Sequence, residues 1–210
     1  MNSEPVIYIV DDDVDSRESA VALVSQMAMR TEAYESAEEF LKHYNGHRPA
    51  CLLTDHRMLG MTGVDLLETL RSKGVTLSVI IMTAYAETQL TVRAIRSGAI
   101  TLLEKPFSNT SLWEAINKAL QEDRVHATNE ARVRRIRERL ASLTDSEQEV
   151  LRLIVNGETN KAVAFEMGVS VRTVESRRSS IFEKMGVTSV AELVQLVMAA
   201  KADSPPPSSS

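Results

Sequence analysis

Short apolar runs alternate with helix-like segments over the first 120 or so residues, and this alternation constrains the fold more than any other feature. Runs such as VIYIV at 6–10 and SVIIM at 78–82 are separated by segments with the apolar spacing of helices. The runs are apolar at consecutive positions, as is typical of strands buried on both faces of a parallel sheet. The pattern therefore predicts an α/β domain with helices on both faces of a parallel sheet.

The expected fold class is a doubly wound, flavodoxin-like sheet of five parallel strands in the order 2-1-3-4-5, followed by a small all-α domain. Four clear strands and one weaker strand are expected at 6–10, 31–35, 50–54, 78–82 and 99–103. The intervening helices are expected at 14–28, 36–44, 63–73, 86–97 and 108–122. In that strand order the first and third strands flank the point where the order reverses, which is where open sheets bind ligands.

From residue 123 the pattern becomes purely helical. Residues 123–142 are polar, rich in arginine and free of Gly and Pro, which predicts a helical linker; a short coiled-coil contact between two copies is the alternative. The capping box TDSE at 144–147 begins a series of four expected helices that ends near residue 200. The predicted division is a sheet domain at 1–122, a linker at 123–142, a helical domain at 143–201 and a disordered tail at 202–210.

Composition and charge exclude several classes of protein. The single cysteine, Cys51, excludes a disulfide framework and a cysteine-based zinc site. No apolar run approaches the roughly 18–20 residues that cross a membrane, so we expect a cytoplasmic protein with no membrane partner. Residues 1–124 carry 12 basic and 18 acidic side chains, whereas residues 125–210 carry 12 basic and 11 acidic side chains. This asymmetry indicates two domains with different partners.

Polar residues gather at the expected carboxyl ends of the strands. Asp11 and Asp12 follow the first strand, Asp55 ends the third, Thr83 follows the fourth and Lys105 follows the fifth. Because the carboxyl ends of parallel strands lie at one edge of a sheet, these groups are expected to share a crevice. Three carboxylates there favour a small hard cation such as Mg²⁺. Together with an ammonium and a hydroxyl group, they suit transfer of a phosphoryl group to an aspartate.

Four motifs in this segment, IYIVDDD, LLTDHRM, IIMTA and LEKPF, make residues 6–122 resemble the receiver domain of two-component response regulators. The resemblance implies that Asp55 accepts a phosphoryl group from a sensor histidine kinase. It also implies that Mg²⁺ is held by Asp12, Asp55 and the backbone carbonyl of Arg57, with Asp11 helping through water. Two further side chains would contact the phosphoryl oxygens, namely Thr83 and Lys105. Asp13 is expected to serve the N-terminus of the following helix.

Two positions depart from the receiver pattern. Leu59 stands where the family usually has proline, and Leu102 stands where it usually has an aromatic ring that moves inward on phosphorylation. A leucine can fill the same space but cannot hydrogen-bond or rotate as a ring. The departures motivate an alternative function, in which a phosphorylation-independent DNA-binding regulator uses its receiver for dimerisation or for binding a partner.

The segment 159–185 has the spacing of a helix-turn-helix, whose second helix enters the major groove of DNA. On that second helix we expect a buried stripe made of Val171, Val174, Ile181 and Met185. The surrounding sequence, from LTDSEQEVL to EKMGV, is similar to the LuxR-type DNA-binding domain. The resemblance implies that three side chains read bases, namely Glu175, Ser176 and Ser179. It implies phosphate contacts from Lys161, Thr173 and Lys184. Arg177, at the flank of the helix where the family often has His, is expected to add a phosphate contact, and the outward-facing Arg172 is also expected to bind DNA.

The combination of domains resembles the FixJ/NarL group of transcriptional regulators. It implies a response regulator that binds promoter DNA sequence-specifically as a homodimer formed on phosphorylation, and that is not an enzyme. The final helix, 189–200, would form the dimer contact. A Mg²⁺-dependent phosphohydrolase on a similar sheet would need an acid such as Asp two residues after its nucleophile, where this chain has Arg57.

Overall fold

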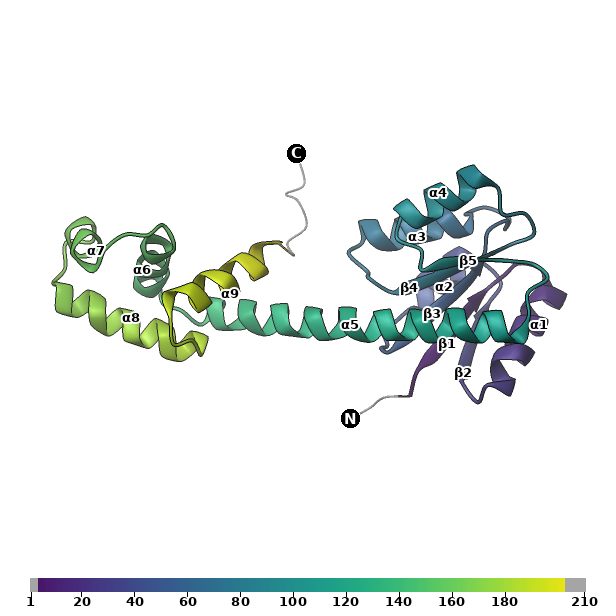
Figure 1. The fold of residues 1–210 in the computed structure, drawn as a ribbon, viewed down its shortest axis with the longest axis horizontal. Helices are drawn as coiled ribbons and strands as arrows, with labels where there is room; N and C mark the ends of the chain where they lie inside the picture. Colours follow the sequence, from purple (N-terminus) through teal and green to yellow (C-terminus); the bar gives the residue numbers. More distant parts are fainter. Residues whose placement is uncertain (1–3, 203–210) are drawn as a thin grey trace. The chain divides into compact units, whose positions relative to one another are not determined.

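The computed structural model describes residues 4–202, and the chain divides into two compact units, one up to Thr128 and one from Asn129. The first unit is built on a parallel sheet with the order β2-β1-β3-β4-β5 (Figure 1). This order confirms the predicted flavodoxin-like fold. The strands are β1 Val6–Val10, β2 Arg30–Tyr34, β3 Ala50–Asp55, β4 Ser78–Thr83 and β5 Thr101–Glu104.

Helices cover both faces of this sheet. They are α1 Val14–Gln26, α2 Ala37–His43, α3 Gly63–Ser72, α4 Thr88–Arg96 and α5 Asn109–Ala141. Successive side chains of a strand point to opposite faces, so each strand contributes to two separate cores. Ile7 and Ile9 of β1 pack with residues of α1 and α5, whereas Tyr8 and Val10 pack with residues of α2, α3 and α4. All five residues of β1 are buried, which explains its unbroken apolar run.

Local chemistry fixes where the helices next to the site begin. The Asp13 carboxylate accepts a hydrogen bond from the backbone N–H of Ser16 at 2.7 Å, which confirms its expected place at the N-terminus of α1. Thr62 and Asp65 form a capping box that begins α3. At Gly63 a Cβ atom would lie 2.3 Å from the carbonyl oxygen of Asp55, so only glycine lets α3 begin this close to the end of β3.

Among the elements whose bounds differ from the prediction, two bear on how the fold is built. The fifth strand begins at Thr101 rather than at 99, because the Ala99 N–H closes α4 by donating to the Ala94 carbonyl at 2.9 Å. Helix α5 runs without a break for 33 residues, through the point where the predicted linker begins. Asp123, the first residue of that linker, is fully buried, ion-paired with Arg48 and hydrogen-bonded to the Ala50 N–H. The exact domain boundaries stay a prediction.

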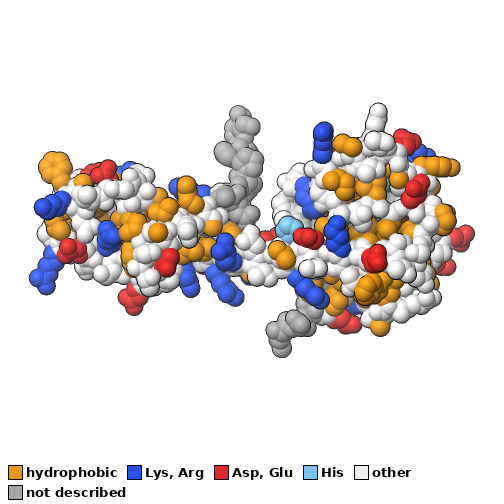
Figure 2. All heavy atoms as spheres, in the orientation of Figure 1, with side chains coloured by type: hydrophobic (Ala, Val, Ile, Leu, Met, Phe, Trp, Pro, Cys, Tyr) orange, Lys and Arg blue, Asp and Glu red, His pale blue; other side chains and the backbone are white. Residues whose placement is uncertain are grey.

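The second unit is helical throughout its described elements. It contains the last part of α5 together with α6 Asp145–Val155, α7 Asn160–Glu166, α8 Val171–Met185 and α9 Val190–Ala202. Val174, Ile181 and Met185 of α8 are buried as predicted, but Val171 is 38% exposed because it begins the helix at the edge of the core. On the face shown in Figure 2, Lys and Arg side chains are prominent on this unit.

The predicted disordered tail, 202–210, lies outside the described residues except for Ala202, which ends α9. Within residues 4–202, no helix is both long enough and apolar enough to span a membrane.

Candidate phosphoacceptor site and DNA interface

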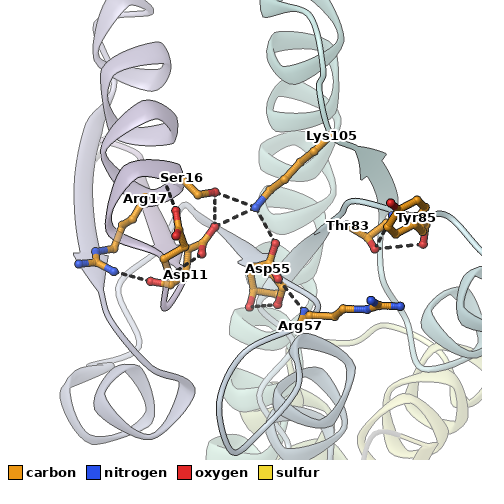
Figure 3. A network of polar contacts seen from close by, with 10 residues as sticks. Asp11, Ser16, Arg17, Asp55, Arg57, Thr83, Tyr85 and Lys105 are labelled. Atoms are coloured by element: carbon orange, nitrogen blue, oxygen red, sulfur yellow. Dashed lines mark hydrogen bonds and ion pairs between the residues drawn. The ribbon is translucent and has the colours of Figure 1, made fainter.

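Two buried carboxylates and one ammonium group meet at the carboxyl edge of the sheet. Asp11 directly follows β1 and Asp55 is the last residue of β3; they are 1% and 8% exposed. Lys105, which follows β5, places its Nζ 2.6 Å from Asp55 Oδ1 and 2.9 Å from Asp11 Oδ2 (Figure 3). The structure therefore brings together three side chains that are far apart in the sequence, as the motif order predicts.

The protonation of Lys105 depends on two opposing influences. Burial disfavours its charged form and lowers its pKa. Lys105 also donates hydrogen bonds to Asp55 and Asp11 and is attracted by their negative charges. Together these outweigh burial and raise the pKa of Lys105 above its ordinary value. Lys105 therefore carries its positive charge at neutral pH, next to the carboxylate expected to receive the phosphoryl group.

Ser16 is a member of this network that sequence reasoning missed. Its hydroxyl donates to Asp11 Oδ2 at 2.6 Å and accepts a hydrogen bond from Lys105 Nζ at 2.8 Å (Figure 3). Arg17, the next residue, donates from Nη1 to the backbone carbonyl of Asp11 at 2.6 Å. The signal was available, because a residue in the first turn of a helix that follows a strand lies close to the end of that strand.

Asp12 is held by a different partner from Asp11. Its Oδ2 accepts a hydrogen bond of 2.7 Å from the backbone N–H of Leu59 in the loop after β3. In the same loop, the backbone N–H of Arg57 donates to Asp55 Oδ2 at 2.6 Å. Proline has no N–H to donate. The replacement of the usual proline by Leu59 therefore gives this chain a hydrogen bond to a predicted metal ligand.

Thr83, at the end of β4, is buried and bonded to the backbone of Tyr85. Its hydroxyl donates to the Tyr85 carbonyl at 3.1 Å and accepts from the Tyr85 N–H at 3.3 Å (Figure 3). The Arg57 guanidinium lies 5.8 Å from the centre of the Tyr85 ring and 3.9 Å from a carboxylate oxygen of Glu87. Two bulky side chains, Arg57 and Tyr85, thus come together from the loops after β3 and β4.

The donor atoms at this edge fit Mg²⁺, because Asp11, Asp12 and Asp55 offer the hard oxygen ligands that this cation prefers. Among residues 4–202, however, no three His, Cys, Asp or Glu side chains are grouped closely enough to hold a metal ion as they stand. Lys105 binds Asp11 and Asp55, while Leu59 binds Asp12. A cation bound at this edge therefore lies close to the Lys105 ammonium and the Leu59 N–H.

Most of the predicted DNA-contacting residues lie on the surface of the helix-turn-helix formed by α7 and α8. A contact between the two helices, from Arg178 Nη1 to Asn160 Oδ1 at 2.9 Å, ties them together. Five of the predicted residues are exposed, namely Lys161, Arg172, Glu175, Ser176 and Ser179. Three are partly buried, namely Thr173, Arg177 and Lys184.

Lys184 has a partner within the second unit that sequence reasoning did not identify. Its Nζ donates to Glu147 at 2.7 Å, and Ser180 donates to the same carboxylate at 2.6 Å. Glu147 is 6% exposed and also forms the capping box with Thr144. The hydrogen bonds from Lys184 and Ser180 and from the Thr144 backbone lower the pKa of Glu147 to about 2. The positive charge of Lys184 is therefore largely neutralised by Glu147 within the second unit.

Comparison with known proteins defines the class. Residues 7–117 match the response regulator receiver domain, and residues 141–197 match the bacterial regulatory proteins of the luxR family. The chain therefore belongs to the response regulators that combine a receiver with a LuxR-type DNA-binding domain, which confirms the predicted family.

Relatives of known type match almost the whole chain. It is 34% identical over 194 residues to the transcriptional regulatory protein FixJ of Azorhizobium caulinodans, covering 92% of each protein. It is 35% identical over 191 residues to the response regulator protein TodT of Pseudomonas putida, covering 91% of this chain and 84% of the relative. The chain is thus a transcriptional response regulator of a two-component system, and its two domains imply a histidine kinase and DNA as partners.

Solved structures agree with this assignment. The response regulator StyR is similar with a TM-score of 0.76 and 35% identity, covering 93% of this chain and 99% of that one. Full-length FixJ from B. japonicum is similar with a TM-score of 0.56 and 33% identity, covering 94% of this chain and 97% of that one.

Proposed function

We propose that Asp55 accepts a phosphoryl group from a sensor histidine kinase in the presence of Mg²⁺, and that this event controls sequence-specific binding to promoter DNA as a dimer. The observation that carries the proposal is the position of Lys105, whose ammonium lies 2.6 Å from a buried Asp55 oxygen at the carboxyl edge of the sheet. We further propose that the protein is a cytoplasmic regulator and not an enzyme.

In the proposed reaction, an Asp55 carboxylate oxygen attacks the phosphorus of a phosphohistidine, and the bond from phosphorus to the histidine nitrogen breaks. Lys105 offsets the negative charge that collects on the phosphoryl oxygens, because its ammonium already lies beside Asp55. Thr83 supplies a hydroxyl donor once it releases the Tyr85 carbonyl. Mg²⁺, when bound by Asp12, Asp55 and the Arg57 carbonyl with Asp11 helping through water, would supply further charge neutralisation.

The DNA-reading step is assigned to α8. Its exposed side chains, Glu175, Ser176 and Ser179, have the hydrogen-bonding groups that base edges in the major groove can pair with. The proposed phosphate contacts are Lys161, Arg172, Thr173, Arg177 and Lys184. Because Lys184 must share its ammonium with Glu147, we expect it to contribute less to DNA affinity than the exposed Lys161. Helix α9 is the proposed dimer contact.

The phosphoacceptor claim is tested by labelling the purified protein with radioactive acetyl phosphate and Mg²⁺. We expect the wild-type chain to become labelled and Asp55→Asn to remain unlabelled, because the amide is not a nucleophile of comparable strength. Asp15→Asn is a matched control, since Asp15 is an exposed carboxylate of α1. Label that persists on Asp55→Asn would place the phosphoryl group elsewhere and contradict the proposal.

The alternative of a phosphorylation-independent regulator is favoured by one observation. Leu102 is half-buried and packs against the core that α2, α3 and α4 share. The aromatic ring that usually moves inward on phosphorylation is therefore replaced by a side chain that already packs against the core. DNA binding that is identical before and after labelling would favour this alternative.

A further inference from the structure

The last part of α5 carries more positive charge than the helix expected to read DNA. Residues 129–141 contain five arginines and two glutamates, whereas residues 171–185 of α8 contain four basic and two acidic side chains. One of the basic side chains of α8 is Lys184, which is paired with Glu147. Since residues 125–210 are close to neutral overall, electrostatic attraction to DNA must come from local concentrations of charge.

Three of these arginines form a stripe along one face of α5. Arg132, Arg135 and Arg139 are spaced by three and four residues, so they are neighbours on the helix surface. All three are exposed, and they lie beside a seam in which Val133 and Ile136 are buried. We call these three residues the arginine stripe.

The arginine stripe lies next to the C-terminal end of α8. Arg139 donates from Nη1 to the carbonyl of Met185, the last residue of α8, at 2.8 Å. Arg132 lines a surface hollow together with Gly186 and Val187, which directly follow α8. The stripe and the recognition helix are therefore neighbouring parts of the second unit, and Figure 2 shows basic side chains over this region.

Nearby carboxylates leave the stripe's charge largely uncompensated. Glu138, three residues after Arg135, is its neighbour on the helix surface, but its carboxylate lies 4.0 Å from Arg134. Glu192 lines the same hollow as Arg132, but its carboxylate accepts hydrogen bonds from the N–H and hydroxyl of Thr188. In the part of the chain that the structure describes, no carboxylate is paired with Arg132 or Arg135.

We propose that the arginine stripe is a second DNA-contacting surface, which binds backbone phosphates beside the bases read by α8. The inference rests on the proposed DNA-binding function. A guanidinium group suits this role because its N–H groups match phosphate oxygens in pairs. Contacts of this kind carry no sequence information, so the stripe strengthens binding to every sequence about equally. Arg139 contributes less than the other two, because one of its N–H groups already binds Met185.

The test uses the full chain with both Arg132→Gln and Arg135→Gln. Arg139 is kept because it also caps the end of α8. The matched control is Arg134→Gln with Arg152→Gln, which removes the same charge from arginines that already contact Glu138 and Glu149. Affinity is measured against salt concentration for two duplexes, one selected from a random pool by the wild-type protein and one a shuffled version of it. Circular dichroism checks that both variants keep their helix content.

For the stripe variant we expect the plot of log affinity against log salt to become shallower by about 0.9 for each phosphate that is no longer neutralised, or about 1.8 for one chain. Both duplexes should weaken by the same factor, and the control should keep the wild-type slope. Replacing Arg132 and Arg135 by lysine should restore most of the slope, because the charge returns.

Two results would overturn the inference. A stripe variant with the wild-type slope would show that these arginines do not contact phosphates. Equal changes of this slope in the stripe and control variants would show that DNA affinity depends on the net charge of the second unit and not on the position of these arginines. A wild-type protein that prefers neither duplex would reject the proposed DNA-binding function as well, so the two failures are distinguishable.

Discussion

At the scale of single residues, the site is defined by the groups that bind each of its three carboxylates. Asp11 and Asp55 bind the same ammonium, that of Lys105, while Asp12 binds the Leu59 N–H. A cation that takes Oδ2 of Asp12 as a ligand competes with that hydrogen bond. Leu59 itself is 85% exposed, so its side chain adds little packing and its backbone N–H is the group that matters.

We therefore predict that Leu59→Pro tightens Mg²⁺ binding, because proline removes the N–H that holds Asp12. A hydrogen bond of net strength about 0.5–1.5 kcal/mol corresponds to a change of roughly 2- to 12-fold. Leu59→Ala is the matched control, since it also removes the side chain but keeps the N–H. Isothermal titration calorimetry with MgCl₂ measures both. Equal affinities for the two variants, or weaker binding by Leu59→Pro, would contradict the competition.

At the scale of elements, α6 and α8 are joined through one buried carboxylate, that of Glu147. Lys184 and Ser180 of α8 both donate to it, and the Thr144 backbone N–H at the start of α6 does the same. The folded state thus favours the charged form of Glu147, and its pKa falls from 4.5 to about 2. The resulting stabilisation is complete above about pH 4.5 and is lost as the pH falls toward about 2.

Glu147→Gln should accordingly destabilise the second unit by about 1–3 kcal/mol at pH 7, because the charge-assisted hydrogen bonds are lost. It should also remove part of the acid sensitivity between about pH 4.5 and 2. Hydrogen exchange of peptides from α6 and α8 measures this for the second unit alone. Glu149→Gln, which changes a partly exposed carboxylate, is the control and should change exchange little. Unchanged exchange in Glu147→Gln would contradict a stabilising role.

The elements also show what the sequence could predict. The strands followed from the local hydrophobic pattern and their order from the expected doubly wound, flavodoxin-like fold class, so Asp11, Asp55 and Lys105 were expected together. Ser16 was missed although its place in the first turn of α1 was a usable signal. The pairing of Lys184 with Glu147 was missed because the sequence does not show how α6 and α8 pack together. Val171 was expected in the core but begins α8 at its edge, since helical spacing gives a face and not the depth at which it is buried.

At the scale of the whole molecule, the proposed function requires that phosphorylation of Asp55 alter the affinity of the second unit for DNA. Such coupling amounts to a shift between two states of the protein, of which phosphorylation favours one. The acidic first part and the locally basic second part give each domain its own partner, a kinase for the receiver and DNA for the LuxR-type domain. Coupling free energies of this kind are typically about 1–3 kcal/mol.

The most direct test of this account is the fluorescence anisotropy of a duplex selected by the phosphorylated protein, titrated with full-length chain before and after treatment with acetyl phosphate and Mg²⁺. We predict that phosphorylation tightens binding by the wild-type chain by roughly 5- to 150-fold, while Asp55→Asn binds equally under both conditions. Wild-type affinity that does not change on phosphorylation, or an Asp55→Asn protein that responds like the wild type, would contradict it.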